Sequence, residues 1–171
     1  MELNFDIPKA NSSIIKVLGV GGGGGNAVNH MYSQGIKGVD FIMANTDAQA
    51  LEQSPIPNKI QIGANTTEGR GAGSKPEIGK KAALESHDDI KSMLDDQTKM
   101  LFITGGMGGG TGTGAAPIIA QAAREMGILT VGIVTTPFNF EGKNRSKRAD
   151  AGIKQLSKNV DTLLVISNDK L

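Results

Sequence analysis

The sequence predicts an α/β fold of three layers, a Rossmann-like parallel sheet with helices on both of its faces. Short apolar runs alternate along the chain with segments whose apolar residues recur at helical spacing. Parallel strands that are buried on both faces read as such continuous apolar runs, and crossover helices connect them. Two dense glycine clusters each follow an apolar run, as turns from a strand into a helix commonly do. A length of 171 residues suits one domain of this kind.

The expected strands are apolar runs of four to seven residues. They lie at residues 14–20, 39–44, 59–62, 100–104, 129–134 and 161–166. The expected helices lie at 26–34, 76–95, 115–126 and 146–158, and a short helical turn follows residue 47. Pro76 suits the first turn of its helix, where its missing N–H would have no partner, and Gly127 suits the end of the helix before it. Loops are expected at 63–75 and 135–144.

Residues 1–12 are expected to form a flexible polar arm ahead of a domain over 13–171. The chain has no cysteine, which excludes disulfides, thiol catalysis and cysteine–zinc sites. Its net charge of +1 gives no general reason to expect a nucleic-acid partner. Residues 1–10 lack the apolar region of a signal peptide, and no apolar run is long enough to cross a bilayer. We therefore expect a cytoplasmic protein that binds no nucleic acid and does not insert into a membrane.

Thirteen of the 24 glycines fall in two clusters, six within residues 19–25 and seven within 105–114. Glycine lets the backbone approach an anion closely, and a following helix adds free N–H groups and a partial positive charge. The first cluster therefore predicts phosphate binding, and the alternative is a turn that only packs closely. Gly19, Gly21 and Gly24 also satisfy the dinucleotide pattern G-x-G-x-x-G, with Asp47 near the end of the second strand.

The second cluster is more informative because a dinucleotide site needs only one such loop. It too leads from an apolar run towards a helix, with Thr111 and Thr113 offering hydroxyl groups at the helix start. Two anion-binding loops on one edge of a sheet predict a polyphosphate held from two sides. The Walker A pattern and its lysine are absent from the sequence. Backbone amides and a bound Mg²⁺ would then have to balance the phosphate charge.

Residues 106–117 read Gly-Met-Gly-Gly-Gly-Thr-Gly-Thr-Gly-Ala-Ala-Pro. This run resembles the tubulin-type signature loop, specifically in the form found in the FtsZ family of bacterial tubulin-like cell-division GTPases. The resemblance extends in register over about residues 13–171. It rests on further matching segments at 20–21, 26–28, 45–51, 71–73, 137–142 and 168–171.

The resemblance implies a set of nucleotide-binding residues spread over all of these segments. They are Gly21, Gly22, Gly23, Gly24, Gly25, Asn26, Asn45, Asp47, Ala72, Gly73, Gly108, Gly109, Gly110, Thr111, Gly112, Thr113, Pro137, Glu141, Arg145 and Asn168.

In this family the two glycine-rich loops hold the phosphates, and the loop corresponding to 71–73 senses the terminal phosphate. Asn45 and Asp47 correspond to residues near the phosphates and the metal. Glu141 corresponds to the acid that binds the ribose hydroxyls, and Arg145 to the arginine beside the ribose and base.

Asn168 lies in the last matching segment and is assigned to the edge of guanine. A side-chain amide suits this role because it can both donate and accept hydrogen bonds. Ser167 stands where the family commonly has proline, and we expect this difference to loosen the turn that carries Asn168. Lys143, Arg145, Lys147 and Arg148 form a basic patch that is expected to be a solvated helix start rather than a nucleic-acid surface.

The resemblance implies binding of GTP or GDP with Mg²⁺, and head-to-tail self-assembly into the division ring at mid-cell with other division proteins. The family continues after the segment at 168–171 into a central helix and a second domain. It hydrolyses GTP with an acidic loop that a neighbouring subunit supplies. We therefore assign no catalytic residue and no direct metal ligand here, expect little or no turnover from this chain, and expect self-association through an uncovered sheet face, such as a non-native dimer.

Two alternatives stay open. An NAD-binding Rossmann oxidoreductase would explain the first glycine cluster, although not the second. A non-catalytic, nucleotide-dependent assembly module would bind GTP without turning it over. Stabilisation by GDP or GTP but not by NAD would separate the first alternative from the GTPase prediction.

Overall fold

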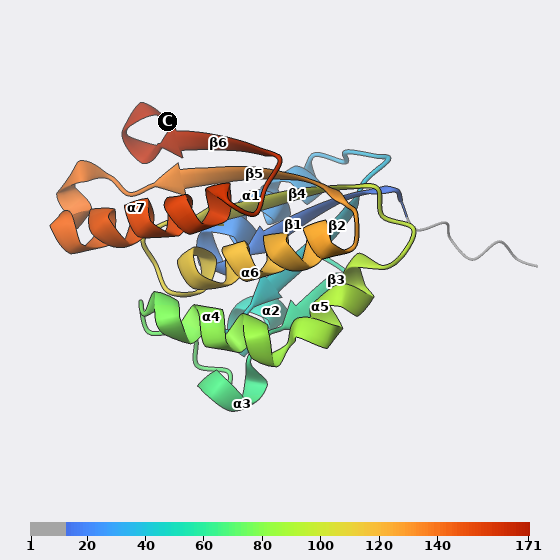
Figure 1. Cartoon of the computed structure of the whole chain (residues 1–171), viewed down its shortest axis with the longest axis horizontal. Coiled ribbons are helices and arrows are strands. Elements are labelled where there is room, and N and C mark those ends of the chain that lie inside the picture. The colour runs from blue at the N-terminus through green and yellow to red at the C-terminus, as the bar shows by residue number, and fades with distance from the viewer. Residues whose placement is uncertain (1–12) are drawn as a thin grey trace, which may run out of the picture.

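The computed structural model describes residues 13–171, and the expected arm at 1–12 lies outside the described residues. Its centre is a six-stranded sheet in the order β3-β2-β1-β4-β5-β6, with every neighbouring pair parallel (Figure 1). The strands are β1 (Ile15–Val20), β2 (Asp40–Asn45), β3 (Asn58–Gln61), β4 (Met100–Gly106), β5 (Leu129–Thr136) and β6 (Thr162–Ser167).

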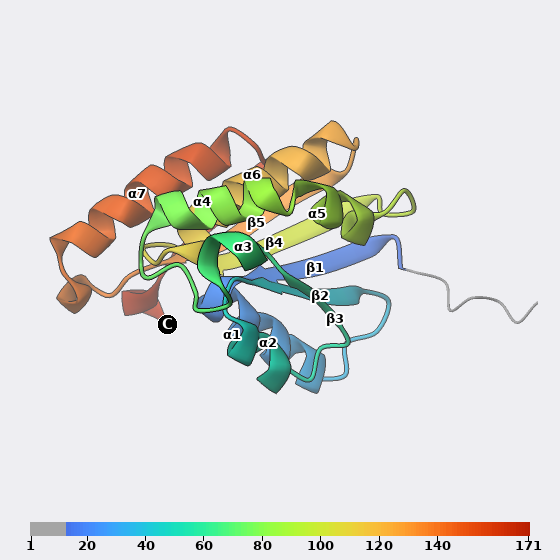
Figure 2. The same cartoon turned by 90° about the horizontal axis from the view of Figure 1, so that it is seen from below.

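Helices cover the sheet on both faces, which confirms the predicted fold class. Helices α1 and α2 lie on one face, and α4, α5, α6 and α7 lie on the other (Figure 2). The helices are α1 (Gly21–Ser33), α2 (Ala48–Gln53), α3 (Ala64–Thr67), α4 (Pro76–Glu85), α5 (His87–Leu94), α6 (Thr111–Glu125) and α7 (Lys143–Ser157). Two 3₁₀ turns, η1 (Asn139–Glu141) and η2 (Asn168–Lys170), complete the described elements. No described helix is both long and apolar enough to cross a bilayer.

Three helices begin earlier than the sequence predicts. Helix α1 starts at Gly21 rather than at residue 26, α6 at Thr111 rather than at 115, and α7 at Lys143 rather than at 146. Glycine is a poor helix former on its own, but tertiary packing overrides this preference at α1. A Cβ on Gly24 would collide with the Thr104 carbonyl oxygen of β4, so glycine is what allows this helix to lie against the sheet.

The predicted helix at 76–95 is divided in two at Ser86. The buried Ser86 hydroxyl accepts a hydrogen bond from the Gly63 N–H at 2.9 Å, which ties the break to the loop after β3. Pro76 occupies the first turn of α4, as predicted. Strands β4 and β5 extend two residues further than predicted, to Gly106 and Thr136, and this extension carries their ends into the site described below.

The core is aliphatic and divided by the sheet into two parts. On the α1 and α2 face it includes Val28 from the first helix and Leu51 from the second, packed against buried strand residues. The larger part lies under α4 to α7 and includes Leu18, Ile103 and Ile119. This packing holds the sheet between two helical layers, so the loops at the carboxyl ends of the strands share one rim.

The strand order places a topological switch point between β1 and β4. The chain leaves β1 for a helix on one face, and it leaves the adjacent β4 for a helix on the other face. In open parallel sheets a crevice forms where neighbouring connections diverge in this way, and ligands bind there. Both glycine clusters lie at this point, since the first leads from β1 into α1 and the second leads from the end of β4 into α6.

Candidate functional site

A cavity of about 410 Å³ opens at the carboxyl ends of the central strands. It is lined by residues from both glycine clusters and from five other segments. These residues are Val20, Gly22, Gly23, Asn45, Thr46, Asp47, Ala50, Gly71, Ala72, Ser74, Gly106, Met107, Gly109, Gly110, Thr111, Gly112, Thr135, Pro137, Glu141, Arg145 and Asn168.

The cavity brings together thirteen of the twenty residues that the resemblance singled out. They are Gly22, Gly23, Asn45, Asp47, Ala72, Gly109, Gly110, Thr111, Gly112, Pro137, Glu141, Arg145 and Asn168. The other seven do not line the cavity: they are Gly21, Gly24, Gly25, Asn26, Gly73, Gly108 and Thr113.

In the first cluster, the early start of α1 explains which glycines line the cavity. Gly22 and Gly23 belong to the first turn of the helix and line it. Gly24 and Gly25 are buried, and a Cβ on Gly25 would collide with the Met43 side chain of β2. The first glycine cluster therefore has two roles. Gly22 and Gly23 line the cavity, and Gly24 and Gly25 let the helix pack against the sheet.

The signature loop is supported by hydrogen bonds to both backbone groups of Gly108. The Gly108 N–H donates to Thr113 Oγ1 at 2.8 Å, and its carbonyl oxygen accepts from Arg148 Nε at 2.9 Å. Its φ of +107° is in the region that favours glycine. Gly108 and Thr113 therefore fix the shape of the loop, while Gly109 and the residues after it line the cavity.

Residues 45–47 after β2 combine a local turn with a link to α6. Asn45 Oδ1 accepts hydrogen bonds from the N–H groups of Thr46 and Asp47, at 2.8 and 3.2 Å. Asp47 Oδ1 accepts from the N–H groups of Gln49 and Ala50 and so caps α2. The Thr46 hydroxyl lies 2.7 Å from the Thr111 hydroxyl, which joins this turn to the start of α6.

Glu141 and Arg145 line the opposite end of the cavity. Glu141 Oε2 accepts a hydrogen bond from the Phe138 N–H at 2.6 Å, and Oε1 lies 3.3 Å from Arg145 Nε. Arg145 Nε is buried and is not aligned to donate to Glu141 or to another described group. Asp47, Glu141 and Arg145 are the charged residues among those that line the cavity, and no lysine lines it.

Asn168 reaches the cavity from the 3₁₀ turn after β6. The Ser167 hydroxyl accepts from the Asp169 N–H at 3.3 Å, and the Asp169 carboxylate accepts from the Asn139 N–H at 3.3 and 3.4 Å. We expected Ser167 to loosen this turn. In the structure its hydroxyl caps the turn, and Asp169 joins the turn to the loop containing η1. The looser turn stays a prediction.

The helix start at 143–148 is only partly solvated. Lys143 and Lys147 are exposed, as expected. Arg145 lines the cavity and Arg148 donates to the Gly108 carbonyl, so both arginines lean towards the signature loop. The four side chains leave this helix turn in different directions, so the two lysines are exposed and the two arginines approach the signature loop. The charge pattern of the sequence alone does not indicate this difference.

Sequence reasoning assigned no individual role to six lining residues: Val20, Thr46, Ala50, Gly106, Met107 and Thr135. Thr46 could have been found, because it lies between Asn45 and Asp47 and both were predicted. Gly106 belongs to the second glycine cluster, which was expected to bind the anion as a whole. Thr135 could not have been found, because it reaches the cavity only through the two-residue extension of β5. Gly71, which belongs to the predicted loop at 71–73, and Ser74, which follows that loop, also line the cavity.

The arrangement favours a ligand with several negative charges. Helices α1 and α6 both begin at this cavity, and their first N–H groups have no partners within their own helices. A Cβ on Gly22 would meet no protein atom within 4 Å, so the backbone there borders open space. Within residues 13–171, no group of three His, Asp or Glu side chains could hold a metal ion. A cation here would therefore take most of its ligands from oxygen atoms of the bound molecule and from water.

Comparison with known proteins agrees with this geometry. FtsZ of Buchnera aphidicola subsp. Baizongia pistaciae is 58% identical over 161 residues, covering 94% of this chain and 42% of the relative. FtsZ of Pseudomonas putida is 57% identical over 170 residues, covering 99% of this chain and again 42% of the relative. The chain therefore spans less than half the length of these two relatives.

Solved structures give the same result. An empty FtsZ dimer from M. jannaschii superposes with a TM-score of 0.89 and 44% identity, covering 95% of this chain and 47% of the other. A GDP-bound monomer of CetZ1 from Haloferax volcanii gives a TM-score of 0.83 and 26% identity, with coverages of 91% and 51%. Residues 14–171 also match the model of the Tubulin/FtsZ family, GTPase domain. The chain belongs to the Tubulin/FtsZ family.

Proposed function

We propose that this chain is the guanine-nucleotide-binding part of a tubulin-like cell-division GTPase and that its cavity holds GTP or GDP. The observation that carries the proposal is the convergence of both glycine clusters, at the starts of α1 and α6, on one cavity at the switch point. A dinucleotide site would need one such loop, and here there are two. The family match and its relatives do not favour the NAD-binding oxidoreductase alternative.

We assign the phosphates to the end of the cavity formed by the glycine clusters. The N–H groups of Gly22, Gly23 and the segment 109–112 would donate to phosphate oxygens, supported by the two helix N-termini. Ala72 would contact the terminal phosphate. The chemistry that Mg²⁺ would supply is neutralisation of phosphate charge, and Asp47 is the carboxylate beside this end that could hold it, directly or through water.

We assign the nucleoside to the end formed by Pro137, Glu141, Arg145 and Asn168. The Glu141 carboxylate can accept hydrogen bonds from vicinal ribose hydroxyls. The Arg145 guanidinium has a buried Nε without an aligned protein acceptor, and a ligand oxygen could accept from it. The Asn168 amide can pair with the donor and acceptor groups on the edge of guanine.

We further propose that the described residues bind nucleotide with little or no turnover. Hydrolysis is the attack of water on the γ-phosphate, and it needs a group that orients this water. The carboxylates that line the cavity are Asp47 and Glu141, and each already accepts backbone hydrogen bonds. In this proposal a neighbouring subunit supplies the missing acidic group. Head-to-tail assembly, division-ring partners and a cytoplasmic mid-cell location belong to the same proposal.

Phosphate release tests this directly. The purified 171-residue chain is incubated with GTP and Mg²⁺, and free phosphate is followed together with bound nucleotide. We expect bound GTP or GDP and almost no release, whereas full-length P. putida FtsZ assayed in parallel releases phosphate. Substantial release by this chain alone would contradict the binding-only assignment, and absence of any bound guanine nucleotide would contradict the site.

A further inference from the structure

A second cavity, of about 430 Å³, lies between α4, α6 and α7, and we call it the helical groove. None of its lining residues belongs to the wall of the nucleotide cavity. Helix α6 forms the floor, since it packs against both α4 and α7. The groove is lined by Pro76, Glu77, Lys80, Thr113, Gly114, Pro117, Ile118, Gln121, Arg148, Ala151, Gly152, Gln155 and Asn159.

The floor of the helical groove is apolar because small residues bring the helices together. A Cβ on Gly114 of α6 would collide with the Pro76 carbonyl oxygen of α4, and one on Gly152 of α7 would collide with the Thr113 side chain. These close approaches leave Pro117, Ile118 and Ala151 lining a recess between the helices. A volume near 430 Å³ falls within the range of about 300–1,000 Å³ typical of ligand pockets.

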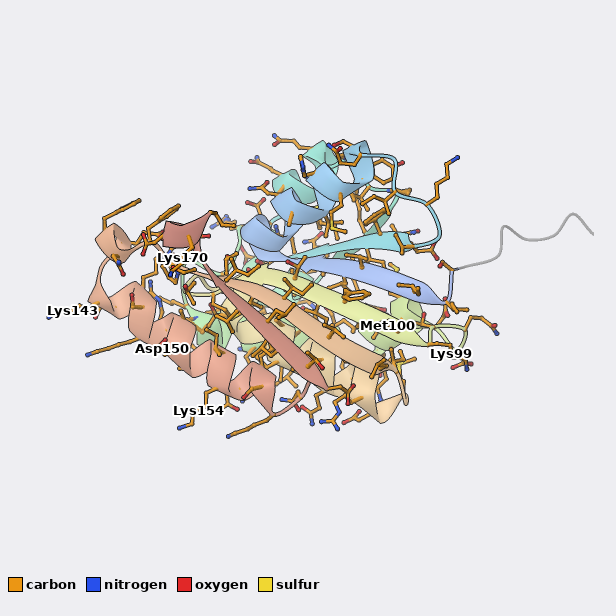
Figure 3. The ribbon with its side chains drawn as sticks, turned by 90° about the horizontal axis from the view of Figure 1, so that it is seen from above. Lys99, Met100, Lys143, Asp150, Lys154 and Lys170 are labelled. Carbon is orange, nitrogen blue, oxygen red and sulfur yellow. The ribbon has the colours of Figure 1, made fainter. Side chains whose placement is uncertain are left out.

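The walls of the groove favour a negatively charged ligand. Lys80 stands on the α4 wall and Arg148 on the α7 wall, against Glu77 as the acidic lining residue. Helix α7 as a whole carries five cationic residues, and its one acidic residue is Asp150. Figure 3 shows Lys143 and Lys154 projecting from the two ends of this helix into solvent. Of these cations Arg148 lines the groove itself, so a ligand in the groove meets positive charge from Arg148 on one wall and from Lys80 on the other.

The rim adds groups suited to a polypeptide backbone. Gln121, Gln155 and Asn159 line the groove with side-chain amides, each of which can donate and accept. We propose that the helical groove docks a peptide segment of a partner protein that presents apolar side chains flanked by Asp or Glu. The apolar side chains would fill the recess over Pro117 and Ile118, and the acids would pair with Lys80 and Arg148.

The helical groove shares two residues with the support of the signature loop. Arg148 Nε donates to the Gly108 carbonyl oxygen, and Thr113 Oγ1 accepts from the Gly108 N–H. Both residues also line the groove. A docked acid that draws Arg148 away from Gly108 would alter the loop, so peptide and nucleotide affinities would be coupled in both directions. This coupling rests on the proposed function, whereas docking itself does not.

Amide chemical shifts of the nucleotide-free chain locate the docking site. The probes are three acetylated, amidated tetrapeptides with Leu-Phe at the centre, flanked by two Glu, two Gln or two Lys. We expect the Glu peptide to shift amides of α4, α6 and α7 around the groove at millimolar concentration. The Gln peptide should bind at least about threefold more weakly than the Glu peptide, as expected from loss of partly exposed charge pairs. The Lys peptide should bind more weakly than the Gln peptide.

Three variants test whether the peptide binds in the groove or elsewhere on the surface. Ala151→Trp fills the recess from an exposed position and should abolish the shifts, and Lys80→Gln should weaken them. Lys81→Gln removes another exposed charge of α4 that does not line the groove and should have no effect. Shifts that map elsewhere, equal binding of all three peptides, or no binding would overturn the proposal. Binding of 2-naphthoate without the Glu peptide would overturn it in favour of a small-molecule site.

GDP titrations with and without saturating Glu peptide then test the coupling. We expect the GDP dissociation constant to change by about fivefold, at the lower end of typical allosteric coupling. An unchanged constant with the peptide bound would overturn the coupling and leave docking intact. If GDP fails to bind even without the peptide, the proposed nucleotide function is wrong while the docking result still stands.

Discussion

Gly108 is the residue where the signature loop meets its support. Its N–H and carbonyl groups are held by Thr113 and Arg148, and its backbone has a positive φ. From the sequence we assigned Gly108 and Thr113 to the nucleotide, because the resemblance gives the loop as one unit. The structure divides the loop into lining and supporting residues, and that division depends on hydrogen bonds that glycine spacing does not reveal.

Gly108→Ala should weaken both folding and nucleotide binding. An L-residue with positive φ costs about 1–2 kcal/mol. A Cβ here would also lie 2.8 Å from Pro137 Cγ and 2.9 Å from Arg145 Cγ, so the loop must shift. We expect a lower free energy of unfolding in urea and at least about tenfold weaker GDP binding, or about 1.4 kcal/mol.

Gly127→Ala is the matched control. Gly127 also has a positive φ, of +75°, but a Cβ there meets no atom within 4 Å. This variant should lose a similar backbone term in stability and keep its GDP affinity. Equal GDP affinities for the two variants would contradict the supporting role of Gly108.

Glu141→Gln should remove the discrimination between ribose and dideoxyribose. If the carboxylate accepts from ribose hydroxyls, the original chain should bind GDP more tightly than 2′,3′-dideoxy-GDP, by about tenfold for a charge-assisted hydrogen bond. The variant should bind the two ligands almost equally. Calorimetric titration of both proteins with both ligands measures this. Unchanged discrimination in Glu141→Gln would show that the carboxylate contacts something else.

At the scale of single elements, the sequence predicted all six strands and most helices, but it placed the starts of α1, α6 and α7 too late. Apolar runs identify buried strands well because both faces of this sheet are covered. A helix start within a glycine cluster is hard to predict because glycine has low helix propensity. The helical turn at the start of α1 is explained by close packing, such as that of Gly24 on β4. The break at Ser86 likewise depends on a distant partner, Gly63.

Lys16 connects β1 to the end of α5, a contact that no motif or spacing predicts. It lies in β1, is only 4% exposed, and donates from Nζ to the carbonyl oxygens of Met93 and Leu94 and to Asp95 Oδ2 at 2.6 Å. Its charge thus sits at the C-terminal end of α5, which a cation stabilises. Lys16→Met should lower the free energy of unfolding by about 2–4 kcal/mol, since it breaks a largely buried ion pair.

The comparison for Lys16→Met is Arg70→Met. Arg70 lies 3.7 Å from Glu68, and both side chains are largely exposed. Its loss should change stability by less than about 0.5 kcal/mol, as for most surface pairs. Urea unfolding of both variants checks the contrast. Losses of similar size would contradict the structural role of Lys16.

At the scale of the whole molecule, the sequence predicted that strand ends would gather at one edge, but it could not predict the strand order. The order places β1 beside β4, and that adjacency brings both glycine clusters to one cavity. Motif spacing along a chain carries no information on which strands are neighbours. The helical groove was not foreseen for the same reason, because it needs α4 and α7 on either side of α6.

The uncovered edge of the sheet should cause self-association. Strand β6 pairs only with β5 within the described sheet, and Leu164, Val165 and Ile166 are 53%, 46% and 38% exposed. No charge or proline interrupts β6, whereas Lys59 lies in the opposite edge strand, β3. Exposed apolar edges of this kind pair with other chains. Sedimentation velocity should show dimers or larger species.

Leu164→Lys should shift this equilibrium towards the monomer. Leu84→Lys is the control, because Leu84 on α4 is also 53% exposed but lies away from the sheet edge. It should leave self-association unchanged. A monomeric original chain at high concentration would contradict the account of this edge.

The most direct measurement of the central claim is a calorimetric titration of the nucleotide-stripped chain with GDP and, separately, with NAD. Two glycine-rich helix starts at one cavity, with Glu141 and Asn168 at its other end, predict saturable binding of one GDP per chain and no measurable binding of NAD. Tight binding of NAD, or no binding of GDP to a chain that is folded by circular dichroism, would contradict the assignment of this cavity to a guanine nucleotide.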